Sequence, residues 1–128
     1  MEVREQPEVV IVETDAYRLE VSSTQPMARL VPAGADPMRL MLLAALDTDG
    51  GADGTLRVAP PTVEHADDGA AVLTLETTST VWDSKRVRLR CTDDEVAFEV
   101  GVTGSGRLAQ ARLLGGWYSG NPRWGGGI

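Results

Sequence analysis

Apolar and polar positions alternate most clearly in residues 86–102, RVRLRCTDDEVAFEVGV, and the pattern predicts a β-hairpin. Apolar side chains occupy every second position on both sides of Thr92–Asp94, which are turn-forming residues. Strict alternation is typical of half-buried strands, because successive side chains point to opposite faces. Both apolar sets can lie on one face only if the loop has an even number of residues, and this condition sets the pairing register of the two strands. We expect Cys91 opposite Val96, Leu89 opposite Phe98, Val87 opposite Val100, and Arg88 opposite Glu99 on the polar face.

Similar runs recur along the rest of the chain. Glu8–Glu13 is almost continuously apolar and predicts a strand buried on both faces, which forms a first hairpin with the alternating run Tyr17–Ser22. Further short strands are expected at Met27–Val31, Thr55–Ala59 and Ala71–Thr77, and at Thr80–Trp82 leading into the arginine-rich strand. Turn signals recur roughly every ten residues, and no helical period is sustained. The sequence therefore predicts an all-β fold, an antiparallel β-sandwich of about eight or nine short strands.

Two apolar runs are ambiguous between strand and helix. Met38–Leu46 is rich in Leu, Met and Ala, which favour helix, but its length and its neighbours favour a buried strand, with a helical turn as the alternative. Arg107–Leu114 could form a short helix, although glycines bracket it at strand length. Residues 1–7 and Thr62–Gly69 are expected to be a polar lead-in and a polar loop.

The composition changes after residue 114, and this change divides the chain. Residues 1–114 form the expected β-sandwich domain, whereas residues 115–128, GGWYSGNPRWGGGI, form a tail or linker rich in glycine and aromatic residues. The three glycines before Ile128 suggest that the chain is a piece of a longer protein.

The overall charge excludes some classes of partner. The 128 residues carry a net charge of −7, with a pI near 4.6. An acidic surface repels phosphate backbones and anionic lipids, so we expect neither nucleic-acid nor membrane binding. The row Arg86, Arg88 and Arg90 is therefore interpreted as a solvated strand face rather than an anion-binding stripe. No basic region precedes an apolar run at the N-terminus, so the default expectation is a cytoplasmic location.

The aromatic tail holds the strongest candidate binding residues. Tryptophan and tyrosine rings can stack on the apolar faces of sugars, and neighbouring amide or guanidinium groups can bond sugar hydroxyls. The candidate ligand-binding residues are Trp117, Tyr118, Asn121, Arg123 and Trp124. The alternative is that these aromatic residues cap an open end of the sandwich or pack on a neighbouring domain.

Other polar clusters offer less. The acidic loop DTDGGADG, with Asp47, Asp49 and Asp53, resembles a calcium loop but lacks its ligand spacing and final glutamate, so a polar turn is expected. His65 is the only histidine; with Glu64 and Asp67–Asp68 it cannot complete a zinc site. We expect no metal and no cofactor.

The chain also lacks the signs of an enzyme. Cys91, the single cysteine, falls on the inward face of the hairpin, where a buried and inert thiol is expected. The motifs GxSxG, GxGxxG and the P-loop are all absent. Nothing in the sequence selects two of the carboxylates as a glycosidase pair. We expect no enzymatic activity from the chain as given.

The order of features in the second half is similar to that of a known group of proteins. STVWDSKRVRLRC, then DDEVAFEVGVTGSGRLAQARLLGG, then the aromatic-glycine segment resembles the amino-terminal β-sandwich of large bacterial glycoside-hydrolase-like proteins. The likeness covers roughly Thr80–Gly127 and includes no catalytic motif. It implies an accessory domain that packs beside a catalytic domain absent from these residues.

Two functions follow as expectations. The first is a non-catalytic accessory domain of a carbohydrate-active protein that binds sugar through the aromatic tail. The alternative is a structural or protein-interaction β-domain that contacts a neighbouring domain or a second copy through a strand edge or the tail.

Overall fold

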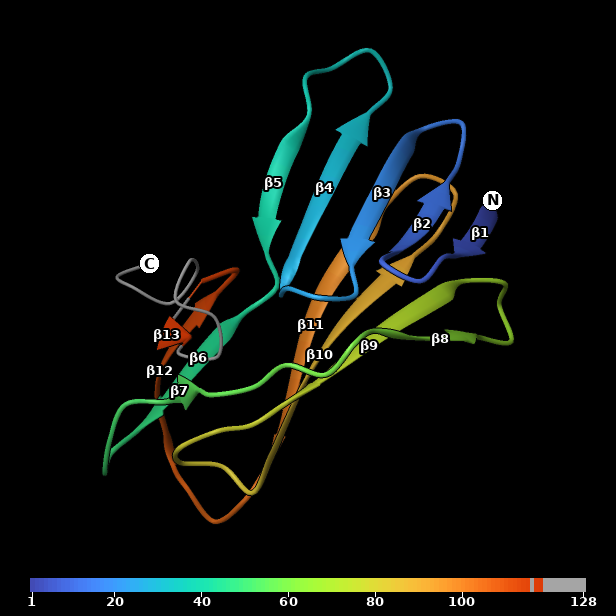
Figure 1. The fold of residues 1–128 in the computed structure, drawn as a ribbon. Coiled ribbons are helices and arrows are strands. Elements are labelled where there is room, and N and C mark those ends of the chain that lie inside the picture. Colours follow the sequence, from blue (N-terminus) through green and yellow to red (C-terminus); the bar gives the residue numbers. More distant parts are fainter. Residues whose placement is uncertain (116, 119–128) are drawn as a thin grey trace.

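The structure, a computed structural model, describes residues 1–115, 117 and 118, and within them it is all-β without helices (Figure 1). The described chain contains thirteen strands, more than the eight or nine expected, because several are very short. The predicted all-β class is therefore confirmed. No helix in this part of the chain is long and apolar enough to span a bilayer.

Most strands belong to two antiparallel sheets. The five-stranded sheet has its strands in chain order: β1 (Glu2–Glu5), β2 (Val9–Glu13), β3 (Tyr17–Ser22), β4 (Met27–Pro32) and β5 (Met38–Met41). The four-stranded sheet has the order β11-β10-β9-β8: β8 (Thr62–His65), β9 (Ala71–Thr77), β10 (Ser84–Cys91) and β11 (Val96–Thr103).

Four further strands gather beyond one end of the five-stranded sheet (Figure 1). β6 (Ala44–Thr48) pairs antiparallel with β12 (Leu108–Leu113), so strands far apart in the sequence lie side by side. β7 (Gly54–Thr55) pairs in parallel with β13 (Trp117–Tyr118). This end of the molecule is called the β6–β12 end below.

The two larger sheets share one apolar core. Inward side chains of β2 and β3 and inward side chains of β9 and β10 form a single buried cluster, and Leu42 joins it. Tyr17 of β3 links the five-stranded sheet to the β10–β11 turn, because its hydroxyl donates a hydrogen bond to the Thr92 carbonyl at 2.5 Å. Burial of this cluster follows directly from the alternation of apolar residues along the strands.

The predicted hairpins are confirmed. β10 pairs with β11 in the expected register, with Cys91 opposite Val96 and Arg88 opposite Glu99. The Thr92 amide closes the turn onto the Glu95 carbonyl at 2.9 Å. β2 pairs with β3, and Arg107–Leu114 contains strand β12 rather than a helix.

The ambiguous run Met38–Leu46 consists of two strands rather than one. It breaks at Leu42–Leu43, where the chain leaves the five-stranded sheet. The Leu42 amide bonds the Pro26 carbonyl at 2.9 Å, and both leucines are buried. The break is therefore stabilised by packing, and no helical turn forms.

Two segments expected to lack structure contain strands. Residues 1–7 include β1, whose backbone pairs with β2 and whose Arg4 lies 3.3 Å from Glu13. The loop Thr62–Gly69 includes β8, which pairs with β9 and packs Val63 against the core. Both predictions were wrong because the polar composition of these segments concealed edge strands, which need only one pairing partner.

Two expected strands, Thr55–Ala59 and Thr80–Trp82, do not form as predicted: the first is reduced to a two-residue strand and an isolated bridge between Val58 and Thr77, and the second is a bend. In place of the expected strand Thr55–Ala59, only Gly54–Thr55 is a strand. It ends there because the amides of Leu56 and Arg57 donate hydrogen bonds to the Thr78 hydroxyl. Thr80–Trp82 is a bend, because the Ser79 hydroxyl accepts hydrogen bonds from the Val81 and Trp82 amides. Side chains that capture backbone amides in this way compete with strand pairing.

Candidate binding site

An ion pair lies fully buried where β10 meets β6 and β7. The ammonium group of Lys85 lies 2.8 Å from a carboxylate oxygen of Asp53, and both side chains are completely inaccessible to solvent. Lys85 also donates hydrogen bonds to the Ala44 carbonyl and the Thr55 hydroxyl, each at 2.9 Å. These three acceptors use all three protons of the ammonium group.

The carboxylate of Asp53 is satisfied as well. One oxygen accepts hydrogen bonds from Lys85 and from the Leu46 amide at 2.9 Å, and the other accepts from the Ser79 hydroxyl at 2.6 Å. Nearby, the Trp82 indole donates to the Leu46 carbonyl at 2.7 Å. A saturated, solvent-free cluster has no free position for a ligand, so this cluster holds β6, β7 and β10 together.

The acidic loop is a structural turn with an internal role. Asp47 accepts a hydrogen bond from the Asp53 amide at 2.9 Å and lies 3.4 Å from Arg112. Asp49 lies 3.9 Å from Arg107 on the surface. Asp53 turns away from both and enters the interior to meet Lys85. The predicted polar turn thus also supplies the partner of a buried lysine.

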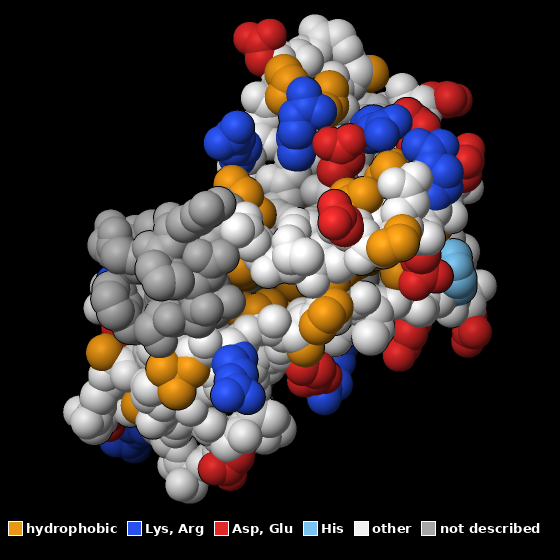
Figure 2. All heavy atoms as spheres, viewed as in Figure 1, with side chains coloured by type: hydrophobic (Ala, Val, Ile, Leu, Met, Phe, Trp, Pro, Cys, Tyr) orange, Lys and Arg blue, Asp and Glu red, His pale blue; other side chains and the backbone are white. Residues whose placement is uncertain are grey.

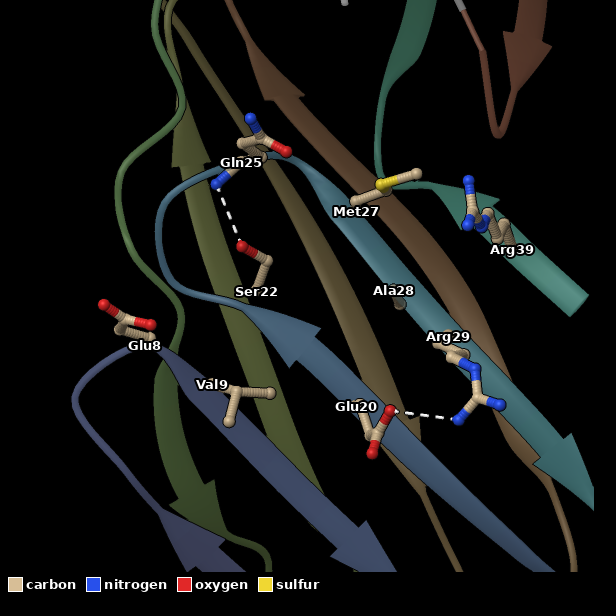
Figure 3. A pocket seen from close by; sticks show the side chains of 9 residues that line it. All are labelled: Glu8, Val9, Glu20, Ser22, Gln25, Met27, Ala28, Arg29 and Arg39. Carbon is tan, nitrogen blue, oxygen red and sulfur yellow. Dashed lines mark hydrogen bonds and ion pairs between the residues drawn. The ribbon is translucent and has the colours of Figure 1, made fainter. Parts of the chain in front are cut away.

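A solvent-facing hollow of about 460 Å³ lies on the outer face of the five-stranded sheet (Figure 3). Its floor is apolar, and polar groups of several strands and loops stand around it. The residues that line it are Glu8, Val9, Glu20, Ser22, Gln25, Met27, Ala28, Arg29 and Arg39. This volume is within the range of small-molecule sites, which also combine an apolar lining with a few polar groups.

The hollow is polar at both ends but differs in charge between them. Glu8 stands at one end, whereas Arg39 and Arg29, the latter paired with Glu20, stand at the other (Figure 3). Ser22 and Gln25 supply a hydroxyl and an amide between the strands. In the space-filling view, basic and acidic side chains gather over the upper part of the molecule, where β3–β5 lie (Figure 2). The hollow thus offers a ligand carboxylate, guanidinium, hydroxyl and amide groups.

Only part of the predicted aromatic site lies within the described structure. The backbone of Trp117 and Tyr118 forms β13 beside Gly54 and Thr55 of β7, at the β6–β12 end. Asn121, Arg123 and Trp124 lie outside the described residues. Neither β13 nor its partner β7 contributes a lining residue to the hollow.

The remaining candidates occupy ordinary structural positions. His65 is exposed in β8, and Asp68 forms an ion pair with Arg90 and accepts a hydrogen bond from the Ala70 amide. Cys91 is fully buried, and burial raises the pKa of its thiol to about 11. Within the residues that the structure describes, no group of three His, Cys, Asp or Glu side chains could hold a metal ion.

Sequence reasoning missed the two most informative features. Lys85 lies on the same face of β10 as Val87 and Leu89, because the three residues are two positions apart. Alternation alone could therefore have predicted a buried cation in β10. Its partner Asp53 could not have been identified, because it lies in a glycine-rich loop 32 residues away. The hollow was also unforeseen, since it depends on the alignment of β2 to β5.

Comparisons with known proteins give no relative. No family model matches the chain, and neither does any curated protein or solved structure.

Proposed function

We propose that this chain is a non-catalytic accessory β-sandwich domain of a carbohydrate-active protein, and that it binds carbohydrate in the outer hollow of the five-stranded sheet. The observation that carries the proposal is the composition of the hollow: an apolar floor from β2 and β4 surrounded by hydroxyl, amide, carboxylate and guanidinium groups.

These groups suit a polyhydroxylated ligand. Sugar hydroxyls both donate and accept hydrogen bonds, so they can pair with carboxylate acceptors such as Glu8 and with the amide of Gln25. The C–H face of a sugar ring can contact Val9 and Met27. None of the lining residues is aromatic, so stacking contributes nothing here and we expect weak affinity.

The predicted site in the aromatic tail remains a separate proposal. Trp117, Tyr118, Asn121, Arg123 and Trp124 supply the stacking groups that the hollow lacks. A ligand held by the tail would depend on tryptophan, whereas a ligand in the hollow would not. The two sites are therefore distinguishable by substitution.

Isothermal titration calorimetry against a panel of oligosaccharides tests the proposal. Binding should be weakened several-fold by Gln25→Ala and left unchanged by Gln110→Ala, a matched change on the exposed strand β12. Loss of binding in Trp117→Ala and Trp124→Ala with Gln25→Ala unaffected would place the sugar at the tail instead. No heat with any oligosaccharide would contradict both sites.

A second candidate function, protein interaction, is favoured by apolar side chains exposed at the β6–β12 end. Leu108 and Leu113 of β12 are 56% and 55% exposed, and Leu56 and Leu114 are also exposed. Apolar groups gathered at one end of a domain mark docking surfaces for protein. In this second candidate function, the domain binds another protein through these leucines, either in addition to sugar or instead of it.

Light scattering across a concentration series tests the second candidate for docking to another copy. The average mass should rise with concentration and return to that of one chain in the variant Leu108→Ser/Leu113→Ser. A constant monomer mass would count against association of copies through this end. Because both leucines are exposed, the variant should remain folded.

A further inference from the structure

The outer face of the five-stranded sheet carries a row of residues that lie opposite one another across the strands. Arg4 of β1 is opposite Ile11, which is opposite Glu20 of β3. Glu20 is opposite Arg29 of β4, and Arg29 is opposite Arg39 of β5. The row therefore ends in two positive charges on adjacent strands.

Acidic groups balance most of this face but not its end. Glu13 lies within 3.5 Å of both Arg4 and Arg18, and Glu20 lies 3.0 Å from Arg18. The remaining contact of Glu20 with Arg29 is longer, at 3.4 Å. Among the residues that the structure describes, Arg39 has no acidic partner within ion-pair distance. Arg39 therefore lies opposite Arg29 without an acidic partner of its own in the described part of the chain.

Two like charges directly opposite in an antiparallel pair destabilise it, since their Cβ atoms are only about 5 Å apart. Here the pair faces solvent, which reduces the cost, but both arginines also line the hollow. Figure 3 shows them at the same end of it on adjacent strands, with the guanidinium group of Arg29 directed towards Glu20 and that of Arg39 directed elsewhere. Because the two residues are directly opposite on adjacent strands, an oxyanion between them could accept hydrogen bonds from both guanidinium groups once these exposed side chains turn towards it.

We propose that Arg29 and Arg39 form a carboxylate-binding site, and that the carbohydrate bound in the hollow carries a uronic acid residue. The inference rests on the function proposed above and specifies its ligand class. The opposite end of the hollow, at Glu8, repels a second carboxylate. The ligand is therefore an oligosaccharide in which the acidic residue lies over the arginines and a neutral residue lies towards Glu8.

Matched ligands isolate the carboxylate. Calorimetric titrations would compare an oligogalacturonide with its methyl ester, and a xylo-oligosaccharide bearing one glucuronate with the unsubstituted chain. Because hydrogen bonds to charged groups are among the stronger ones, the acidic member of a pair should bind about tenfold more tightly or better. Since Glu8 disfavours a second acid, the singly substituted xylo-oligosaccharide should show the larger preference.

Matched variants isolate the site. Arg39→Gln and Arg29→Gln should each reduce the acidic preference to within about twofold. Arg88→Gln is the control, because Arg88 is also exposed, lies on the other sheet and has no ion-pair partner in the described part of the chain. An equal loss in Arg88→Gln would show that net charge, and not this site, produces the preference.

The outcomes separate this inference from the function on which it rests. Equal binding of acidic and neutral members would overturn the carboxylate site and leave carbohydrate binding intact. Inorganic sulfate or phosphate that competes as well as the acidic sugar would support an oxyanion site but overturn the uronic acid. No binding of any sugar would overturn both proposals.

Discussion

Two regions of this molecule gather charge, and they do so in opposite ways. Around Lys85 and Asp53 every polar atom of the two side chains has a partner and no solvent reaches them. Around Arg29 and Arg39 two like charges share an exposed end of a hollow with one carboxylate, that of Glu20, which lies 3.4 Å from Arg29. The first region is chemically saturated, and the second is incomplete.

The difference indicates which charges serve the fold and which serve a ligand. A buried ion pair is tolerated only when its geometry and its additional hydrogen bonds offset the desolvation of both groups. Exposed charges contribute little to stability, so Arg39 can stand beside Arg29 without an acidic partner of its own at small cost. We therefore expect substitutions in the first region to change stability and substitutions in the second to change binding.

The largest effect should come from a charge buried without a partner. Leu42 is fully buried in the core, so Leu42→Asp should abolish the folded state, because the new carboxylate would have no cation beside it. Circular dichroism and one-dimensional NMR would measure this. Leu56→Asp is the control, since Leu56 is 51% exposed and the variant should stay folded. A folded Leu42→Asp variant would contradict the assigned core.

The next largest effect concerns the buried ion pair. Lys85→Met should lower the free energy of unfolding by about 3–5 kcal/mol, because Asp53 would remain buried and uncompensated. The double variant Lys85→Met/Asp53→Leu should recover part of that loss. Urea unfolding of the single variants and the double variant measures the coupling. Additive losses would show that the pair does not act as a unit.

A smaller effect should appear in alkaline solution. Burial raises the pKa of Cys91 from its ordinary 9.0 to about 11, and burial also raises the pKa of Tyr17. Both groups lose their protons more readily in the unfolded chain. The contribution of these two groups to the free energy of unfolding is thus complete below about pH 9. The part that comes from Cys91 is lost as the pH rises through 11. Urea unfolding at a series of pH values should show that the free energy of unfolding declines in this range. Cys91→Ala should make the decline with pH less steep. An unchanged slope in Cys91→Ala/Tyr17→Phe would refute the assignment.

The smallest change in stability should come from the exposed arginine. Arg39→Gln should alter the free energy of unfolding by no more than about 0.5 kcal/mol, because Arg39 is exposed and has no ion-pair partner among the described residues. Thermal unfolding measures this. A large loss of stability would mean that Arg39 supports the sheet and that its effect on binding is indirect.

Alternation predicted much of the fold but little of the candidate site. The register of β10 and β11 follows from parity, because one face must be buried, and the structure reproduces it. The edge strands β1 and β8 were missed, since their composition resembles that of loops. The pairing of β6 with β12 joins residues at least sixty positions apart, which no local pattern encodes.

The candidate site depends on the same long-range arrangement. Glu8, Ser22 and Arg39 are unremarkable in the sequence, and they line one hollow only because β2, β3, β4 and β5 align in order. The opposition of Arg29 and Arg39 likewise requires the register of β4 with β5. In contrast, the aromatic tail was noticed from composition alone, which does not encode where a ligand binds.

Chemical-shift mapping by NMR tests the central claim most directly. Amide resonances would be assigned and followed during titration with an acidic oligosaccharide. Carbohydrate binding in the hollow predicts changes that cluster at β2–β5, strongest around Met27–Arg29 and Arg39, with the indole signals of Trp117 and Trp124 unmoved. Changes confined to those indoles or to β12, or none at saturating sugar, would contradict the claim.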